Sequence, residues 1–171
     1  TTWLILGGSL VRGVTPLASA DYAWLGVRED QSTGRALAEA GDVDGDGLDD
    51  LLTGGHGALD TDETAGANWL ILGSSLEEAS SSLADVSHSF VSEGPGDYAG
   101  DAMASADVDG DGRPDLVFGA HMNARGGEEC GAVYLFLNDS VQEPGTYSLG
   151  DADRIWVGES SFDRAGVSLQ S

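Results

Sequence analysis

The chain has 171 residues and a formal net charge of −23, with 30 acidic residues against seven arginines and no lysine. An excess of negative charge on this scale repels polyanions, so we expect no nucleic-acid partner and no attraction to acidic membrane surfaces. Hydrophobic residues make up 40% of the chain, and its 26 glycines with 4 prolines indicate many turns rather than disorder. The composition predicts a turn-rich globular protein that is long enough to bury a core.

The sequence shows no signal peptide and no apolar run that could cross a membrane, so we expect no membrane insertion. Cys130 is the single cysteine, which excludes a disulfide within the chain. The chain opens directly on a strand-like segment, which suggests a piece of something longer.

In chain order, the first recurring element occupies residues 3–10 and reads Trp-Leu-Ile-Leu-Gly-Gly-Ser-Leu. It returns 66 residues later at 69–76, and a looser copy follows after another 65 residues at 134–141. Tandem units of a fixed period predict an array in which each unit buries its face against the next.

Within one unit, a segment of small residues comes first, at 34–41 and again at 100–106. Its apolar alternation and its alanine and glycine content favour a strand that packs where space is tight. An alanine-rich segment could also form a helix, but only seven or eight residues are available before the next motif.

Two aspartate-rich loops follow these segments, at residues 42–50 and 107–115, with carboxylates at loop positions 1, 3, 5 and 9 and glycine at positions 4 and 6. Four carboxylates so close together repel one another unless a cation lies among them, and Ca²⁺ takes six to eight oxygen ligands in flexible geometry. We predict two Ca²⁺ sites in which positions 1, 3, 5 and 9 supply side chains and position 7 its backbone carbonyl. The ligands are Asp42, Asp44, Asp46, Leu48 and Asp50 in the first loop and Asp107, Asp109, Asp111, Arg113 and Asp115 in the second.

The alternatives to these Ca²⁺ sites are an EF-hand, a Mg²⁺ site and a turn that binds no metal. An EF-hand needs a bidentate glutamate at position 12, where this chain has Thr53 and Phe118. Mg²⁺ is less suited than Ca²⁺ to a cage made entirely of protein oxygens. An aspartate–glycine turn with no metal is the remaining alternative.

Short apolar runs closed by glycine follow both loops, at 50–55 and 115–120, and predict buried strands. The unit is completed by three further elements. These are a polar loop, the strand that begins at Trp69 or Tyr134, and an outer segment (87–91 or 154–158). The acidic run 60–63 in the first polar loop is predicted to be a solvated loop tip, with a further calcium-type patch as the alternative. Four strands per unit without a helix are typical of a propeller blade.

Histidine and tryptophan occur at repeated places. His56 and His121 are 65 residues apart, and we interpret them as one structural position in two blades that need not meet. Trp3 and Trp69 begin the repeated strand, so we expect both in the core rather than on a sugar-stacking surface.

The pattern resembles the FG-GAP repeats of the integrin α-subunit β-propeller, whose loops also carry Asp-x-Asp-Gly-Asp-Gly-x-x-Asp. The likeness rests on both loops, the strand at 115–120 and the segment 131–137. The Phe-Gly of the family is replaced here by Thr33-Gly34, Ala99-Gly100 and Ala165-Gly166. The resemblance therefore implies a divergent, prokaryotic member of the calcium-binding β-propeller family.

We expect an all-β partial propeller of the integrin α type, with two complete blades of four antiparallel strands and flanking strands. Residues 1–32 are assigned to the outer strands of an incomplete blade, 33–98 and 99–164 to blades with one Ca²⁺ loop each, and 165–171 to the first strand of a truncated blade. Family propellers have about seven blades, so this chain is expected to be a fragment of a longer one or to self-associate.

The expected function is a calcium-binding module, not an enzyme, that lies outside the cell or on its surface and binds a protein or a glycan. One alternative is an architectural array whose only ligand is Ca²⁺. The other is part of a calcium-dependent propeller hydrolase or lyase, for which the sequence offers no general base and too few cationic residues.

Overall fold

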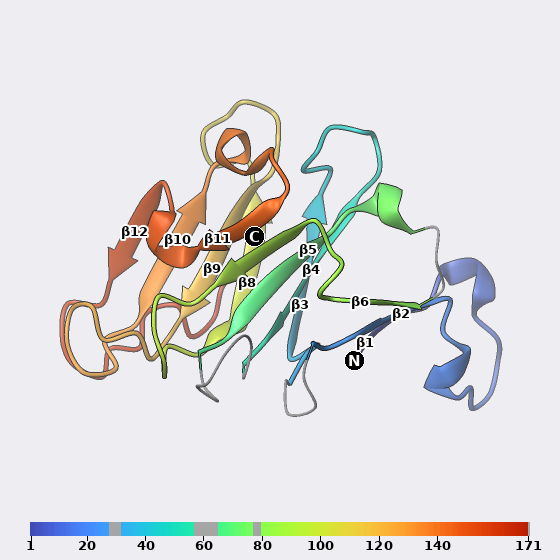
Figure 1. Ribbon diagram of the computed structural model, residues 1–171, viewed down its shortest axis with the longest axis horizontal. Coiled ribbons are helices and arrows are strands. Elements are labelled where there is room, and N and C mark those ends of the chain that lie inside the picture. Colours follow the sequence, from blue (N-terminus) through green and yellow to red (C-terminus); the bar gives the residue numbers. More distant parts are fainter. Residues whose placement is uncertain (28–31, 57–64, 77–79, 171) are drawn as a thin grey trace.

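The computed structural model describes residues 1–27, 32–56, 65–76 and 80–170 (Figure 1). Within these ranges the chain forms twelve β-strands and five 3-10 helices of one turn each. This confirms the all-β class. The acidic run 60–63 lies outside the described residues. None of the described helices is long and apolar enough to cross a membrane.

The strands form three sheets that stand side by side as blades (Figure 1). The first blade contains β1 (Thr2–Leu4), β2 (Tyr22–Leu25) and β6 (Ser80–Ser82). The second contains β3 (Ala36–Gly41), β4 (Asp50–Gly55), β5 (Ala67–Ile71), β7 (His88–Val91) and β11 (Gly145–Ser148). The third contains β8 (Ala99–Ala106), β9 (Asp115–Ala120), β10 (Ala132–Phe136) and β12 (Arg154–Val157).

The third blade is the four-stranded antiparallel meander that the repeat predicts, in the order β12-β10-β9-β8. The second blade has the same four antiparallel strands in the order β7-β5-β4-β3. The short helices η1 (Gly7–Ser9), η3 (Gly73–Ser75) and η4 (Asn138–Val141) recur directly after the strands β1, β5 and β10. Two others, η2 (Leu17–Ser19) and η5 (Leu149–Asp151), recur before the strands β2 and β12.

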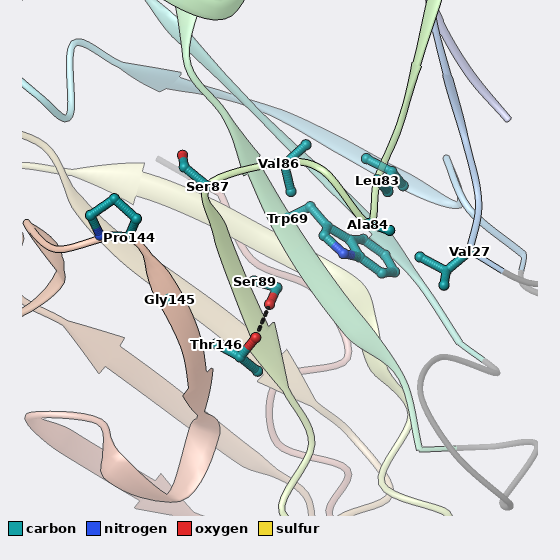
Figure 2. Close-up of a pocket in the computed structure, with 10 residues that line it drawn as sticks. All are labelled: Val27, Trp69, Leu83, Ala84, Val86, Ser87, Ser89, Pro144, Gly145 and Thr146. Atoms are coloured by element: carbon teal, nitrogen blue, oxygen red, sulfur yellow. Dashed lines mark hydrogen bonds between the residues drawn. The ribbon is translucent and has the colours of Figure 1, made fainter.

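Two strands were not anticipated from the sequence, because each leaves its own repeat. β6 pairs in parallel with β2 of the first blade, and β11 pairs in parallel with β7 of the second. A hydroxyl hydrogen bond of 2.9 Å between Ser89 and Thr146 spans the second of these junctions (Figure 2). The second and third repeats thus each contribute one short strand to the blade before them.

The core lies between the blades. Phe90 of the second blade packs against Phe118 and Phe136 of the third, with ring centroids 4.7 and 5.2 Å apart. Between the first and second blades, Trp69 is only 1% exposed and packs with Trp24. Trp3 is 41% exposed, so its predicted place in the core is wrong. Trp69 is covered by the sheet of the preceding repeat, and Trp3 has no such sheet in this chain.

Glycines occur where consecutive repeats touch backbone to backbone. A Cβ atom on Gly54 would collide with the carbonyl oxygen of Gly100, and one on Gly119 would collide with that of Gly166. Gly166 therefore lies against the third blade as Gly100 lies against the second. Residues 165–170 form only an isolated parallel bridge, between Gly131 and Ala165, so a further strand here stays a prediction.

Candidate metal centre

The two aspartate-rich loops occupy equivalent places, one between β3 and β4 and the other between β8 and β9. In the first, Gly47 N–H donates to Asp42 Oδ2 (2.9 Å), Asp46 N–H to Asp44 Oδ1 (3.1 Å) and Leu48 N–H to Asp46 Oδ1 (2.8 Å). These bonds curl the backbone around its own carboxylates. Gly45 and Gly47 have positive φ values of 76° and 89°, which side chains disfavour.

The second loop has the same three hydrogen bonds and one more, from Gly110 N–H to Asp107 Oδ1 (2.7 Å). Gly112 N–H donates to Asp107 Oδ2 (3.0 Å), Asp111 N–H to Asp109 Oδ1 (3.1 Å) and Arg113 N–H to Asp111 Oδ1 (2.8 Å). The two stretches differ only at loop positions 7 and 8, and their backbones fold in the same way.

The aspartate at position 9 closes each loop. Asp50 is buried and accepts hydrogen bonds from Val43 N–H (2.9 Å) and Gly73 N–H (2.8 Å). Burial raises the pKa of Asp50, the two hydrogen bonds oppose this, and the nearby charges of Asp44 and Asp46 add to the rise. A cation among these carboxylates would relieve that repulsion.

Asp115 has the same role in the second loop. It is fully buried and accepts from Val108 N–H (2.8 Å) and Asn138 N–H (2.9 Å). In both loops the closing aspartate therefore holds the loop backbone and also the start of the short helix after the third strand, η3 or η4.

Three of the predicted ligands come together in each loop. Carboxylate oxygens of Asp42, Asp44 and Asp46 lie within 4.8 Å of one another, and so do those of a second group, Asp107, Asp109 and Asp115. Asp50 and Asp111 lie outside these groups. Ligation by any of these residues, and by the carbonyls of Leu48 and Arg113, stays a prediction.

The donor set fits a hard cation. Each group offers only carboxylate oxygens, which are the ligands that Ca²⁺ prefers. In addition, Asp42 Oδ1 is buried and accepts no hydrogen bond from the described residues. A buried carboxylate oxygen without a partner is costly, and a bound cation would satisfy it.

Asn138 is a residue of this centre that sequence analysis missed. Its backbone N–H bonds Asp115 of the second loop, and its side-chain Nδ2 donates to the carbonyl of Val43 in the first loop at 2.6 Å. Its Oδ1 accepts from Arg113 Nη1 (3.2 Å) and Gln142 Nε2 (2.8 Å). One buried amide therefore ties the two loops together. The repeat gives no signal for it, because the equivalent residues are Gly7 and Gly73.

The two repeated histidines lie near one carboxylate, that of Asp101, which the sequence did not reveal. His56 Nδ1 lies 3.2 Å from Asp101 Oδ1, and His121 Nδ1 lies 3.9 Å from Asp101 Oδ2. Arg35 Nε also donates to Asp101 Oδ1, at 2.6 Å. Burial lowers the pKa of His56, and the charge of Asp101 partly offsets this. Stacking of the second and third blades brings equivalent residues onto one carboxylate.

Comparison with known proteins agrees with this geometry. The FG-GAP repeat family model matches residues 99–136, which contain β8, the second loop, β9 and β10. Human integrin alpha-IIb is 38% identical over 77 residues, which cover 42% of this chain and 7% of the integrin. The match thus spans a small part of that relative's length.

Proposed function

Since the chain carries FG-GAP repeats of the integrin-like family, we propose that it is a calcium-binding propeller module that acts outside the cell or on its surface. In this proposal it binds a protein or a glycan and catalyses no reaction. The observation that carries the proposal is the pair of matched loops, each with three carboxylates close enough to share one ion.

Calcium is the ion that best fits these loops. A nine-residue turn with short acidic side chains supplies several oxygens in flexible geometry, whereas Mg²⁺ demands near-ideal octahedral geometry and keeps several waters. Millimolar extracellular Ca²⁺ would keep even loops of modest affinity filled.

The role proposed for the ion is structural. Each loop joins two neighbouring strands of its blade, and its closing aspartate also holds the helix η3 or η4. An ion that binds only the folded loop stabilises the fold by mass action. Because Asn138 spans both loops, ordering of the second loop would also help to order the first.

Titration calorimetry of the chelator-treated chain tests the calcium part of the proposal. We expect uptake of two Ca²⁺ ions, loss of one ion in Asp44→Asn, and loss of the other in Asp109→Asn. Asp139→Asn is a matched control, because Asp139 is exposed and lies outside both loops. The absence of Ca²⁺ uptake by the folded chain would contradict the proposal.

A glycan array and a pull-down from extracellular fluid, each with and without chelator, test the binding part. A partner that is retained only with Ca²⁺ supports a recognition module. If neither assay retains a partner under either condition, the array is architectural and the binding part of the proposal is wrong.

A further inference from the structure

The junction of the second and third blades brings two histidines onto one carboxylate. His56 directly follows β4, and His121 directly follows β9. His56 Nδ1 lies 3.2 Å from Oδ1 of Asp101, and His121 Nδ1 lies 3.9 Å from Oδ2 of the same side chain. Ring nitrogens from two different repeats therefore face the two oxygens of one carboxylate.

Both of these ring nitrogens are unsatisfied. The Nδ1 atoms of His56 and His121 are buried, and neither makes a hydrogen bond with any residue that the structure describes. Burial lowers the pKa of His56, so its ring is neutral near pH 7 and its nitrogen is available as a ligand. A buried polar atom without a partner is costly, and a cation between the rings and the carboxylate would remove that cost.

The distances suit a bound metal ion. Two ligands of one tetrahedral Zn²⁺, each about 2.0–2.2 Å from the ion, lie about 3.3–3.6 Å from each other. The contact of His56 with Asp101, at 3.2 Å, is close to this spacing. The contact of His121, at 3.9 Å, is slightly longer, and rotation about the broad χ2 torsion of histidine can shorten it.

The donor set differs from that of the aspartate-rich loops. Two imidazoles and one carboxylate are ligands that suit Zn²⁺ and other divalent transition-metal ions. Ca²⁺ and Mg²⁺ instead prefer shells made of oxygen alone. The cluster therefore selects a different class of ion from the one that the loops fit.

Arg35 contacts the same carboxylate, and its charge opposes a cation there. Its Nε donates to Asp101 Oδ1 at 2.6 Å, but the two oxygens of a carboxylate can accept at about four positions. Carboxylates that bind metals are commonly hydrogen-bonded from outside the site, which fixes their orientation. The Arg35 side chain is 51% exposed, so solvent screens its charge. Arg35 thus orients Asp101 and leaves Oδ2 for an ion.

The backbones that carry these ligands are held rigidly. Gly55 and Gly100 directly precede His56 and Asp101, and a Cβ atom on Gly100 would lie 2.6 Å from the backbone nitrogen of Gly55. The ring of Tyr98 packs against both imidazoles, with centroids 5.2 Å from that of His56 and 5.8 Å from that of His121. Such close support holds a binding site in place.

The ligand side chains are also within reach of solvent. Those of His56, His121 and Asp101 are 17%, 14% and 12% exposed. An ion can therefore enter without unfolding of the blades.

The carboxylate of this cluster is not a feature of the repeat. The residues equivalent to Asp101 are Arg35 and Val167, so an acidic side chain occurs at this place in one repeat of the three. The cluster is therefore particular to the junction of the second and third blades.

We propose that His56, His121 and Asp101 form a binding site for a divalent transition-metal ion, with Zn²⁺ as the best match. One ligand comes from the second blade and two from the third, so the bound ion joins the blades. Water completes the tetrahedral shell. This site is separate from the aspartate-rich loops, because each loop precedes the strand, β4 or β9, that the histidine follows.

Calorimetric titration of the full chain with Zn²⁺ tests the site. The chain is first treated with chelator and then saturated with Ca²⁺, so that the loops are filled and do not compete for Zn²⁺. We expect uptake of one Zn²⁺ ion per chain at pH 7.5. Co²⁺ should replace Zn²⁺ and give the visible absorption of a tetrahedral Co²⁺ complex, which reports the ligand geometry directly.

Replacement of the ligands should weaken this binding. Loss of a residue that only supports a metal ligand costs about 10–100-fold in affinity. We therefore expect His56→Gln, His121→Gln and Asp101→Asn each to lower Zn²⁺ affinity by at least about tenfold. His88→Gln is the matched control, because His88 is the third histidine of the chain and lies in β7. It should leave the affinity within about twofold.

The melting temperature gives a second measurement. An ion that binds only the folded chain stabilises it by mass action, so Zn²⁺ should raise the melting temperature of the unmodified chain and of His88→Gln. The rise should be lost in His56→Gln and His121→Gln. Circular dichroism checks that each variant is folded.

Two results would overturn the proposal. One is a folded chain that takes up no Zn²⁺ in saturating Ca²⁺. The other is Zn²⁺ uptake that His56→Gln and His121→Gln weaken no more than His88→Gln does, because this would mean that the ion binds elsewhere. Neither result depends on whether the loops bind Ca²⁺, which the separate Ca²⁺ titration decides.

Discussion

The second and third blades are built from the same motif, but their surroundings give them different dependencies. The loop of the third blade contacts its neighbour through Asn138, which reaches the carbonyl of Val43 in the second blade. At the equivalent place the second blade has Gly73, where a Cβ atom would lie 2.6 Å from the carbonyl oxygen of Asp49. The two loops thus share most of their own hydrogen bonds but differ in their contacts with the neighbouring blade.

A repeat protein can therefore couple neighbouring sites through a single side chain that is present in one repeat and absent from the equivalent position of the others. Loop 42–50 depends on the third blade for a hydrogen bond to its backbone, while loop 107–115 receives no such bond from the described residues of the second blade. A mutation that disturbs the third blade should therefore disturb the second blade more than a mutation in the second blade disturbs the third.

The largest effect is expected for Asp115→Ala. Asp115 is fully buried and accepts two backbone hydrogen bonds, and each bond to a charged group contributes about 1.5–3 kcal/mol. We expect the free energy of unfolding to fall by about 3–5 kcal/mol, measured by urea denaturation in chelator. Asp50→Ala is the matched change in the first loop and should cost less, because it leaves Asn138 in place. Equal losses would contradict the asymmetry.

The loss of a single bound Ca²⁺ ion is expected to have the next largest effect. At free Ca²⁺ about a hundredfold above the dissociation constant, each filled site adds about 2.7 kcal/mol to the stability of the fold. Chelation should lower the melting temperature of the unmodified chain more than that of Asp44→Asn or Asp109→Asn. If the loops are coupled through Asn138, Asp109→Asn should also weaken Ca²⁺ binding at the first loop, which calorimetry can measure. Independent sites would give additive losses.

Asn138→Ala removes the link itself. It leaves the carbonyl of Val43 without its partner, and an unsatisfied buried group costs about 1–3 kcal/mol. We expect Ca²⁺ affinity to fall more at the first loop than at the second. Gln142→Ala removes only bonds to Asn138 and serves as the milder control. A loss confined to the second loop would argue against the link.

The smallest expected effect is a pH dependence of stability that arises from a histidine of the second blade. Burial lowers the pKa of His88, so the folded chain keeps this ring neutral below the usual value of about 6.5. As pH falls through that value, the unfolded chain binds a proton that the folded chain does not, and stability decreases. The contribution is fully present above that pH.

Replacement of His88 by glutamine should reduce the slope of stability against pH below about 6.5, by at most about 1.4 kcal/mol per pH unit. The equivalent residue in the third blade is Arg154, so that blade has no histidine at this place. Thermal melts between pH 5 and 7.5, run for the unmodified chain and His88→Gln, measure the effect. Identical slopes for the two proteins would show that His88 is not responsible.

The sequence alone predicted the repeat, the local structure of the loops and the strands other than β6 and β11. Aspartates at loop positions 1, 3 and 5 bond backbone N–H groups a few residues away, and the glycines permit the turn, so these bonds need no residue outside the loop. The strand segments follow from apolar runs between turn residues. These features depend on near neighbours in the chain, which a sequence pattern records.

The contacts between residues of different blades are known from the tertiary structure alone. Asn138 and Val43 are 95 residues apart, and two histidines of different repeats meet at Asp101. Trp3 and Trp69 share a motif but differ in exposure, because a preceding sheet covers only Trp69. The strands β6 and β11 also cross between repeats. Such contacts depend on the angle and spacing at which rigid sheets stack, and no local pattern encodes that relation.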